Sequence, residues 1–227
     1  MPTILLARHA QASFGAADYD VLSPAGLEQA HALAADLERR GVRVDRVVTG
    51  SLTRQRDTAA PVAVAAGVVA AVDPRWDEYL TDDILAHHSA AGARLESSPG
   101  AEALPLSSRD FQDVLERALL AWIAAGAEGP TAEPWPAFAA RVDAALADVV
   151  RVLGRGETAL VCTSGGVLGA ICVRLLGLPA PALVAFNRVT VNAGVTRVVH
   201  GRGGTTLVSF NEHAHLERPG GSLVTYR

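Results

Sequence analysis

Lysine is absent from this chain of 227 residues, and all 20 positions counted together as Lys and Arg are arginine. Without lysine, chemistry that needs an amine side chain, such as a Schiff base or the lysine of a P-loop, is excluded. Any phosphate bound through a fixed side-chain cation is therefore bound through arginine. Nothing in the sequence indicates a cofactor.

Cysteine, strong net charge and long apolar runs are also scarce. Only Cys162 and Cys172 occur, both within apolar sequence, which favours buried reduced thiols and a cytoplasmic protein over a disulfide framework. The formal charge of -4 comes without a block of like charge, so neither nucleic acid nor a membrane surface is expected as a partner. The N-terminal residues lack the pattern of a signal peptide or a membrane span. Small molecules are the ligands that remain.

Short apolar runs recur along the chain and predict a well-filled core. The hydrophobic fraction is 49% and the mean hydropathy is +0.22, which suits one domain over residues 1–227. The runs are continuous rather than alternating, so we expect strands that are buried on both faces. They span residues 3–7, 45–49, 68–72, 158–162, 194–199 and 205–210.

Helical patterns separate these runs. Ser23 is a candidate N-cap, Pro24 occupies the first helical position, and Gly41 follows the predicted end. Further helices are expected after Gly50 through Ala66, after Gly166 through Leu176, over 109–125 and over 137–153. This alternation predicts a three-layer α/β/α sandwich with a mostly parallel mixed sheet, whose last two strands form a hairpin. Residues 80–135 break the pattern and predict a partly helical insertion that caps the sheet.

Polar sequence follows three of the expected strands: "ARHAQAS", "TGSLTRQRDTA" and "CTSGGV". The carboxyl ends of parallel strands share one edge of an open sheet, where ligands usually bind. Arg54 lies in the first turn of one helix, and Ser164 and Gly165 begin another, so two helix N-termini offer N–H groups to an anion. With Arg8 they predict a phosphate pocket, because arginine binds tetrahedral oxyanions bidentately.

His9 stands beside these cations. Two neighbouring guanidiniums lower the pKa of an imidazole, which would leave a nitrogen lone pair free to attack phosphorus. Asp77 and Glu78 follow the third strand at the same sheet edge, and a carboxylic acid there could protonate the leaving oxygen. Gln11 and Ser13 are candidate neutral donors to the phosphate, or else they satisfy the loop backbone.

These residues resemble the motifs of the histidine phosphatase superfamily, also called phosphoglycerate mutase-like. Arg8 and His9 match its Arg-His-Gly signature, with Ala10 in place of the glycine. "SLTRQRDTA" is similar to its second motif and places the second phosphate-binding arginine at Arg54, while "WDEYL" is similar to its Leu-x-Glu element and indicates Glu78 as proton donor. The resemblance implies a metal-independent phosphatase that forms a phosphohistidine on His9 from a small phosphomonoester. A homodimer is left open.

One position departs from the family pattern. The family's fourth motif reads Ser-His-Gly-Gly, and this chain has Ser164 where the histidine stands. In the family that histidine hydrogen-bonds the transferring phosphoryl group, whereas serine is shorter and carries no charge. We expect a rate roughly 10²- to 10³-fold lower unless another residue compensates. A protein that binds a phosphorylated ligand without turnover is therefore the alternative function.

A third function, a serine esterase, would use Ser164 as the nucleophile of a "CTSGG" elbow. The acids after it are Glu212 and Glu217, and Glu212 adjoins His213, which predicts poor triad geometry. Metal ligands are expected neither at His87 and His88 with Asp82 and Asp83 nor at His213 and His215, because both groups lack further ligands at a convincing spacing.

Overall fold

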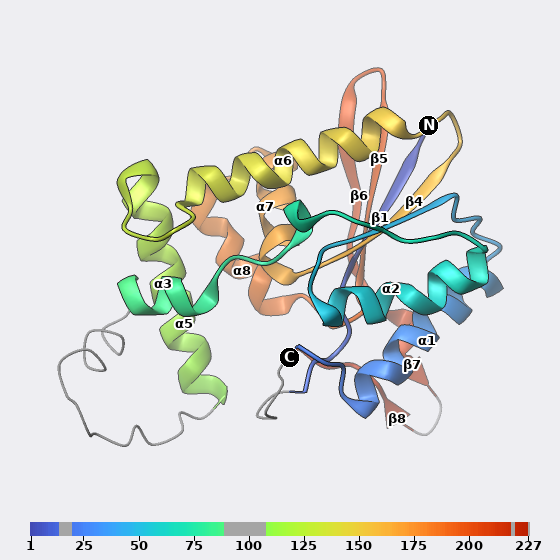
Figure 1. Ribbon diagram of the computed structural model, residues 1–227, viewed down its shortest axis with the longest axis horizontal. Coiled ribbons are helices and arrows are strands. Elements are labelled where there is room, and N and C mark those ends of the chain that lie inside the picture. The colour runs from blue at the N-terminus through green and yellow to red at the C-terminus, as the bar shows by residue number, and fades with distance from the viewer. Residues whose placement is uncertain (14–19, 89–107, 219–220, 227) are drawn as a thin grey trace.

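The computed structural model describes residues 1–13, 20–88, 108–218 and 221–226 and contains a six-stranded sheet between two helical layers (Figure 1). The strand order is β3-β2-β4-β1-β5-β6. The strands are β1 (Thr3–Arg8), β2 (Arg46–Thr49), β3 (Ala71–Val72), β4 (Thr158–Thr163), β5 (Val195–Gly201) and β6 (Gly204–Glu212). A separate pair is formed by β7 (Glu217–Arg218) and β8 (Gly221–Ser222).

The sheet is mixed, as the sequence predicts. β1 pairs in parallel with β4, from Thr3 opposite Thr158 to Arg8 opposite Thr163, and β2 lies parallel to both β4 and β3. β5 runs antiparallel to β1 and to β6, which confirms the predicted hairpin. The one strand of this sheet that runs opposite to the others is therefore β5, which lies next to the edge strand β6. All six predicted strands are present.

The α-helices are α1 (Pro24–Arg39), α2 (Thr53–Ala66), α3 (Thr81–His88), α5 (Ser108–Ala125), α6 (Trp135–Val152), α7 (Gly165–Leu176) and α8 (Leu183–Val189). Short 3-10 turns are η1 (Pro74–Trp76), η2 (Gly126–Glu128), η3 (Ala180–Ala182) and η4 (Ala214–Leu216). Helices α3 and α8 were not predicted, because segments this short carry too little periodic signal to separate a helix from a loop.

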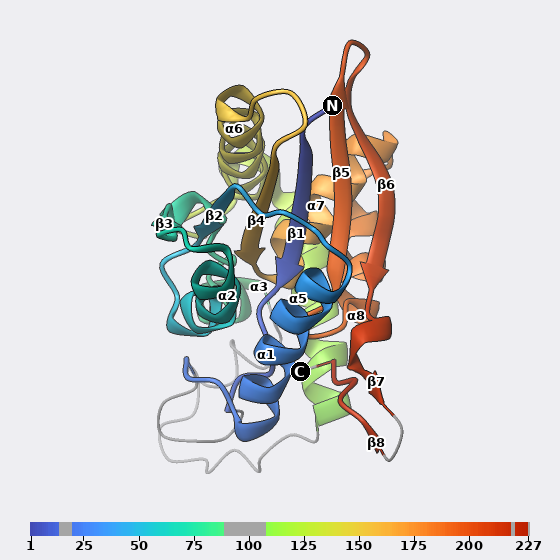
Figure 2. The same cartoon turned by 90° about the vertical axis from the view of Figure 1, so that its right-hand side faces the viewer.

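Alternate residues of β1 divide the core into two layers. Leu5 and Ala7 pack in the cluster formed with α1 and α2, while Ile4 and Leu6 belong to the cluster formed with α6 and α7. Figure 2 shows α1 in front of the strands and α7 behind them. The predicted three-layer sandwich is confirmed, because helices cover both faces of the sheet and the central strands β1 and β4 are buried on both of their faces.

Helix α1 packs closely against the loop that follows β1. Ser23 caps it, its Oγ accepting from the Gly26 N–H at 3.0 Å. A Cβ placed on Gly26 would lie 2.1 Å from the carbonyl oxygen of Gln11, so only glycine permits this approach. The loop that carries His9 is thereby pressed against the first turn of α1.

The predicted insertion at about 80–135 contains α3 and α5, and its residues 89–107 lie outside the described part of the chain. Both helices lie together at the left of Figure 1, away from α1 and α2. Ile84 and Leu119 share one hydrophobic cluster with Phe138 and Ile171, so this cap has no separate core. Phe138 is its centre, with ring centroids of Trp122 and other aromatic side chains within 5.5 to 6.0 Å.

Cys162 and Cys172 are free and buried, as expected. Burial raises the pKa of each thiol to about 12, so neither is a reactive thiolate near neutral pH. Among the described residues, no helix combines the length and the apolar character needed to cross a membrane.

Candidate active site

The backbone of His9 is held on both sides as the chain leaves β1. Its N–H donates to the Thr163 carbonyl at 2.7 Å. Its own carbonyl accepts from the N–H of Ala193 at 3.3 Å and from Nδ2 of Asn192 at 3.2 Å. Only 5% of the residue is exposed. These contacts come from segments more than 150 positions away, so the tertiary fold fixes where the imidazole lies.

The imidazole of His9 has a defined tautomer. Nδ1 lies 2.8 Å from the carbonyl oxygen of Ala10, and a carbonyl only accepts, so Nδ1 carries the hydrogen and Nε2 carries the lone pair. The pKa of His9 lies well below its ordinary value, mainly because the ring is buried and also because Arg8 and Arg54 are close. Near neutral pH the ring is therefore neutral, with Nε2 available as a nucleophile.

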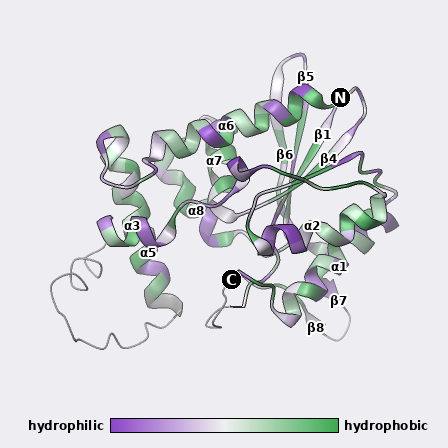
Figure 3. Cartoon of the chain, viewed as in Figure 1, coloured by the Kyte–Doolittle hydropathy of each residue, from purple (hydrophilic) through white to green (hydrophobic). Residues whose placement is uncertain are grey.

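Two arginines approach this ring from different elements. Nη1 of Arg8 donates to the carbonyl oxygens of Thr190 and, at 2.9 Å, Tyr226. Arg54 lies in the first turn of α2, a hydrophilic segment in Figure 3. Both cations lower the pKa of His9, and both also act to lower the pKa of Glu78, against the larger upward effect of its burial. The two arginines therefore act electrostatically on both His9 and Glu78.

A carboxylate already occupies the N-terminus of α2. Nη1 of Arg54 lies 2.6 Å from Oδ1 of Asp20, and Oδ2 of the same carboxylate accepts from the Thr53 N–H at 2.7 Å. The guanidinium and the free N–H of a helix N-terminus thus bind one anion together. This arrangement is of the kind that holds a phosphate.

Glu78 follows η1 in the chain, and its carboxyl group contacts the N-terminus of α7. Its Oε2 accepts from the N–H of Gly166 at 3.0 Å and its Oε1 from the N–H of Tyr79 at 3.2 Å. Burial raises its pKa, and this outweighs the lowering by the two N–H groups and by the two arginines. A Cβ on Gly166 would stand 2.3 Å from Oε1, so this glycine makes room for the carboxyl group. A carboxyl group with a raised pKa suits a general acid.

Asp77, the alternative donor, is engaged elsewhere. Its Oδ1 accepts from the N–H of Ser51 at 2.6 Å and its Oδ2 from the hydroxyl of Ser51 at 2.5 Å. Both carboxylate oxygens thus tie the η1 loop to the end of β2. The geometry favours Glu78 as the proton donor.

The other predicted phosphate ligands have different surroundings. Ser164 directly precedes α7 and is fully buried, and Gly165 is the first residue of that helix. The side chain of Gln11 accepts from the hydroxyl of Ser23 at 2.8 Å, and the N–H of Ser13 donates to the Val21 carbonyl at 2.9 Å. These contacts bind the loop to the chain before and at the start of α1. The phosphate-binding roles of Gln11 and Ser13 stay predictions.

Three residues of the site escaped prediction from the sequence. Asp20 pairs with Arg54 although the two are 34 positions apart, a separation at which local sequence patterns do not predict a contact. Gln55 donates from Nε2 to Ser164 Oγ at 2.9 Å, and the one local indication of its place in the site is its position directly beside Arg54 in the sequence. Asn187 donates to the hydroxyl of Tyr79 at 3.1 Å. It lies on α8, the helix that the sequence did not predict.

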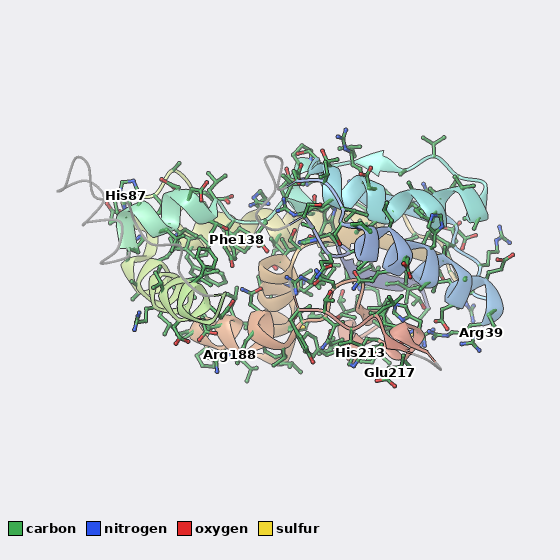
Figure 4. The ribbon with its side chains drawn as sticks, turned by 90° about the horizontal axis from the view of Figure 1, so that it is seen from below. Arg39, His87, Phe138, Arg188, His213 and Glu217 are labelled. Carbon is green, nitrogen blue, oxygen red and sulfur yellow. The ribbon has the colours of Figure 1, made fainter. Side chains whose placement is uncertain are left out.

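The arrangement does not support the esterase. Glu212 accepts a hydrogen bond from Ser209, and Nδ1 of His213 donates to the Asn211 carbonyl, whereas the hydroxyl of Ser164 is bonded to Gln55. His87 lies at the cap end of the molecule and His213 far from it (Figure 4). Within the described ranges, no group of three or more His, Cys, Asp and Glu side chains could hold a metal ion.

A family model described as histidine phosphatase superfamily (branch 1) matches residues 4–123 and 105–213. The chain belongs to the histidine phosphatase superfamily. Among curated members, it is 27% identical over 231 residues to a probable phosphoglycerate mutase, GpmB, of Yersinia pestis (strain Pestoides F), covering 96% of this chain and 97% of that one.

Solved structures share the fold. A phosphoserine phosphatase variant from Entamoeba histolytica, bound to phosphoserine, has a TM-score of 0.65 at 18% identity and covers 96% of this chain and 100% of that chain. A mycobacterial glucosyl-3-phosphoglycerate phosphatase has a TM-score of 0.60 at 22% identity, with coverage of 92% and 98%. The phosphoglycerate mutase-like fold expected from the motifs is thus confirmed.

Proposed function

We propose that this protein is a metal-independent phosphomonoesterase that works through a phosphohistidine on His9. One observation carries the proposal: Nδ1 of His9 donates to the Ala10 carbonyl, which leaves the lone pair of Nε2 beside two guanidiniums. The names of the related phosphatases and of the mutase support a small phosphomonoester as the substrate class.

The reaction has two steps. Arg8, Arg54 and the N-terminus of α2 hold the phosphoryl oxygens while Nε2 of His9 attacks phosphorus. The bond from phosphorus to the alcohol oxygen breaks, and the carboxyl group of Glu78 gives its proton to that oxygen. Water then attacks the phosphohistidine, its proton passes to the Glu78 carboxylate, and inorganic phosphate leaves a neutral imidazole.

The second candidate is a protein that binds a phosphorylated ligand without turnover. Its support is Ser164, which stands where the motif resemblance expects an imidazole and whose hydroxyl accepts a hydrogen bond from a glutamine amide. A neutral hydroxyl cannot supply the charge-assisted hydrogen bond that an imidazolium supplies. Both candidates share the phosphate pocket, so only turnover separates them.

The test is hydrolysis of p-nitrophenyl phosphate in the presence of EDTA. We expect turnover by the wild type and an acid-labile phosphoryl label that His9→Ala abolishes. The matched control is His31→Ala, which removes an exposed imidazole from α1. Turnover that His9→Ala leaves intact would overturn the nucleophile. Absence of turnover, with inorganic phosphate still raising the melting temperature, would establish the binding protein.

A further inference from the structure

Gln55 is a fully buried polar side chain between the second and third strand exits. It lies on α2 next to Arg54, and none of its surface is exposed. Its Nε2 lies 3.1 Å from the carbonyl oxygen of Trp76 and 2.9 Å from Oγ of Ser164. The amide thus connects α2 to Ser164, which stands where the motif resemblance expects a histidine, and to the loop that leads to Glu78.

The direction of these hydrogen bonds is fixed by the acceptor at one end. A carbonyl oxygen only accepts, so the amide atom beside Trp76 is the nitrogen and not the oxygen. Both hydrogens of Nε2 are then used, one on the Trp76 carbonyl and one on Ser164. Oγ of Ser164 must accept, and its own hydrogen must go to another group.

The hydroxyl hydrogen of Ser164 has no acceptor within the described residues. The hydrogen bond from Gln55 is the one that its hydroxyl makes there, and its side chain does not cap α7. The residue is fully buried at the N-terminus of that helix, directly after Thr163, whose carbonyl holds the N–H of His9. A buried hydroxyl hydrogen without an acceptor calls for one from a ligand.

The surroundings of Gln55 are built to hold the amide. A Cβ on Gly50 would lie 2.0 Å from Oε1 of Gln55, so glycine at the end of β2 leaves room for the amide. The hydroxyl of Thr163 also donates to the Trp76 carbonyl, at 2.6 Å. The Trp76 carbonyl thus accepts from both Gln55 and Thr163, which fixes the position of the amide relative to the end of β4.

We propose that Gln55 is a positioning residue that turns the hydroxyl hydrogen of Ser164 toward the phosphoryl group at His9. The inference rests on the proposed phosphatase function and adds to it the residue that partly compensates for the absent imidazole. The amide and the hydroxyl do not titrate near neutral pH, so this donor is available at every pH at which the protein is folded.

The decisive variant is Gln55→Glu. An ionised carboxylate only accepts, so it takes the hydrogen of Ser164 and turns it away from the phosphoryl group, whereas the protonated form can still donate to Oγ. We expect kcat relative to wild type to fall with rising pH, by up to about 10²-fold, the cost of one lost donor. KM should change far less than kcat.

The control is the same substitution in the Ser164→Ala background. Ser164→Ala by itself should lower kcat by about 10²-fold, and adding Gln55→Glu should then cause no further pH-dependent loss, because no hydroxyl remains to orient. The same pH-dependent loss in both backgrounds would show a general effect of the buried charge and overturn the inference. A fully active Ser164→Ala would overturn it as well.

Gln55→Met keeps the assay decisive if the acidic variant does not fold. Methionine has similar length and removes both hydrogen bonds without adding charge. Its effect on kcat should disappear in the Ser164→Ala background, and additive effects would count against a positioning role.

Failure of the inference and failure of the proposed function give different results. A wild type without turnover, or an active His9→Ala, ends the phosphatase proposal and the inference with it. Turnover that depends on His9 but is insensitive to every Gln55 variant ends only the inference.

Discussion

Thr58 on α2 accepts a hydrogen bond of 2.8 Å from the backbone N–H of Ala10. The same hydroxyl donates to the Arg54 carbonyl at 2.7 Å. One buried side chain therefore joins the residue after His9 to the turn that carries Arg54, and the nucleophile and a phosphate ligand are held at a set distance although 45 residues separate them in the sequence.

Thr58→Val should leave the N–H of Ala10 buried without an acceptor. We expect the free energy of unfolding in urea to fall by about 1–3 kcal/mol, the cost of an unsatisfied buried donor. Thr58→Ser retains the hydroxyl and should keep most of this stability. Equal stability of the valine variant would show that the hydrogen bond is replaced, for example by water.

Asp20→Asn should tighten the binding of inorganic phosphate. The carboxylate of Asp20 occupies the Arg54 guanidinium and the Thr53 N–H that a phosphate would use, so a bound anion must displace it. Removal of its charge should raise affinity several-fold in isothermal titration calorimetry, about 1 kcal/mol for a partly exposed ion pair. Asp57→Asn, an equal charge change on an exposed part of α2, should have little effect. Weaker binding in Asp20→Asn would mean that Asp20 supports Arg54 instead of competing with phosphate.

Glu78→Gln should slow substrates with poor leaving groups more than those with good ones. An alkyl alkoxide needs a proton from Glu78, whereas p-nitrophenolate leaves with little assistance. The ratio of kcat for p-nitrophenyl phosphate to kcat for glycerol phosphate should therefore rise by about 10-fold or more, since general acids contribute about 10²- to 10⁴-fold. Asp77→Asn should lower stability through the loss of its contacts to Ser51 and leave that ratio unchanged. A change of the ratio in Asp77→Asn alone would assign the proton donor to Asp77.

His9 should make the protein less stable in mild acid. Its pKa in the folded protein lies well below the ordinary value of about 6.5, so below that pH the unfolded chain binds a proton that the folded chain does not. The free energy of unfolding should fall as the pH drops from about 6.5 toward the lowered pKa, with no such change above about 6.5.

The measurement compares wild type with His9→Asn, in which the other titrating groups, including Glu78, are common to both proteins. Their difference in unfolding free energy should be constant from pH 7 to 8 and should shift in favour of the variant at pH 5.5. A difference that does not vary with pH would contradict the lowered pKa of His9.

Local patterns in the sequence were sufficient for most of the fold. Residues 137–153 are predicted as a helix, and Phe138, Val142, Leu146 and Val149 form a buried stripe along α6 in the structure. Ser23 predicted the start of α1 for the same local reason, because a cap bonds a backbone group only three residues away. Helices α3 and α8 were missed because their stability comes from packing and not from their own short sequences, as Ile84 of α3 illustrates in the hydrophobic cluster that it shares with α6 and α7.

The sequence by itself determined which chemical groups stand at the strand exits: Arg8 and His9, Arg54, Glu78 and Ser164, because each follows a strand or begins a helix that local patterns predict. Only the tertiary structure decided which nitrogen of His9 is free, which of two adjacent carboxyl groups faces α7, and that Gln55 holds Ser164. The hydrogen bond of Glu78 to Gly166 spans 88 positions of the chain, and that of Gln55 to Ser164 spans 109. Local sequence patterns do not reach that far, and which groups meet across such distances sets the direction of each hydrogen bond.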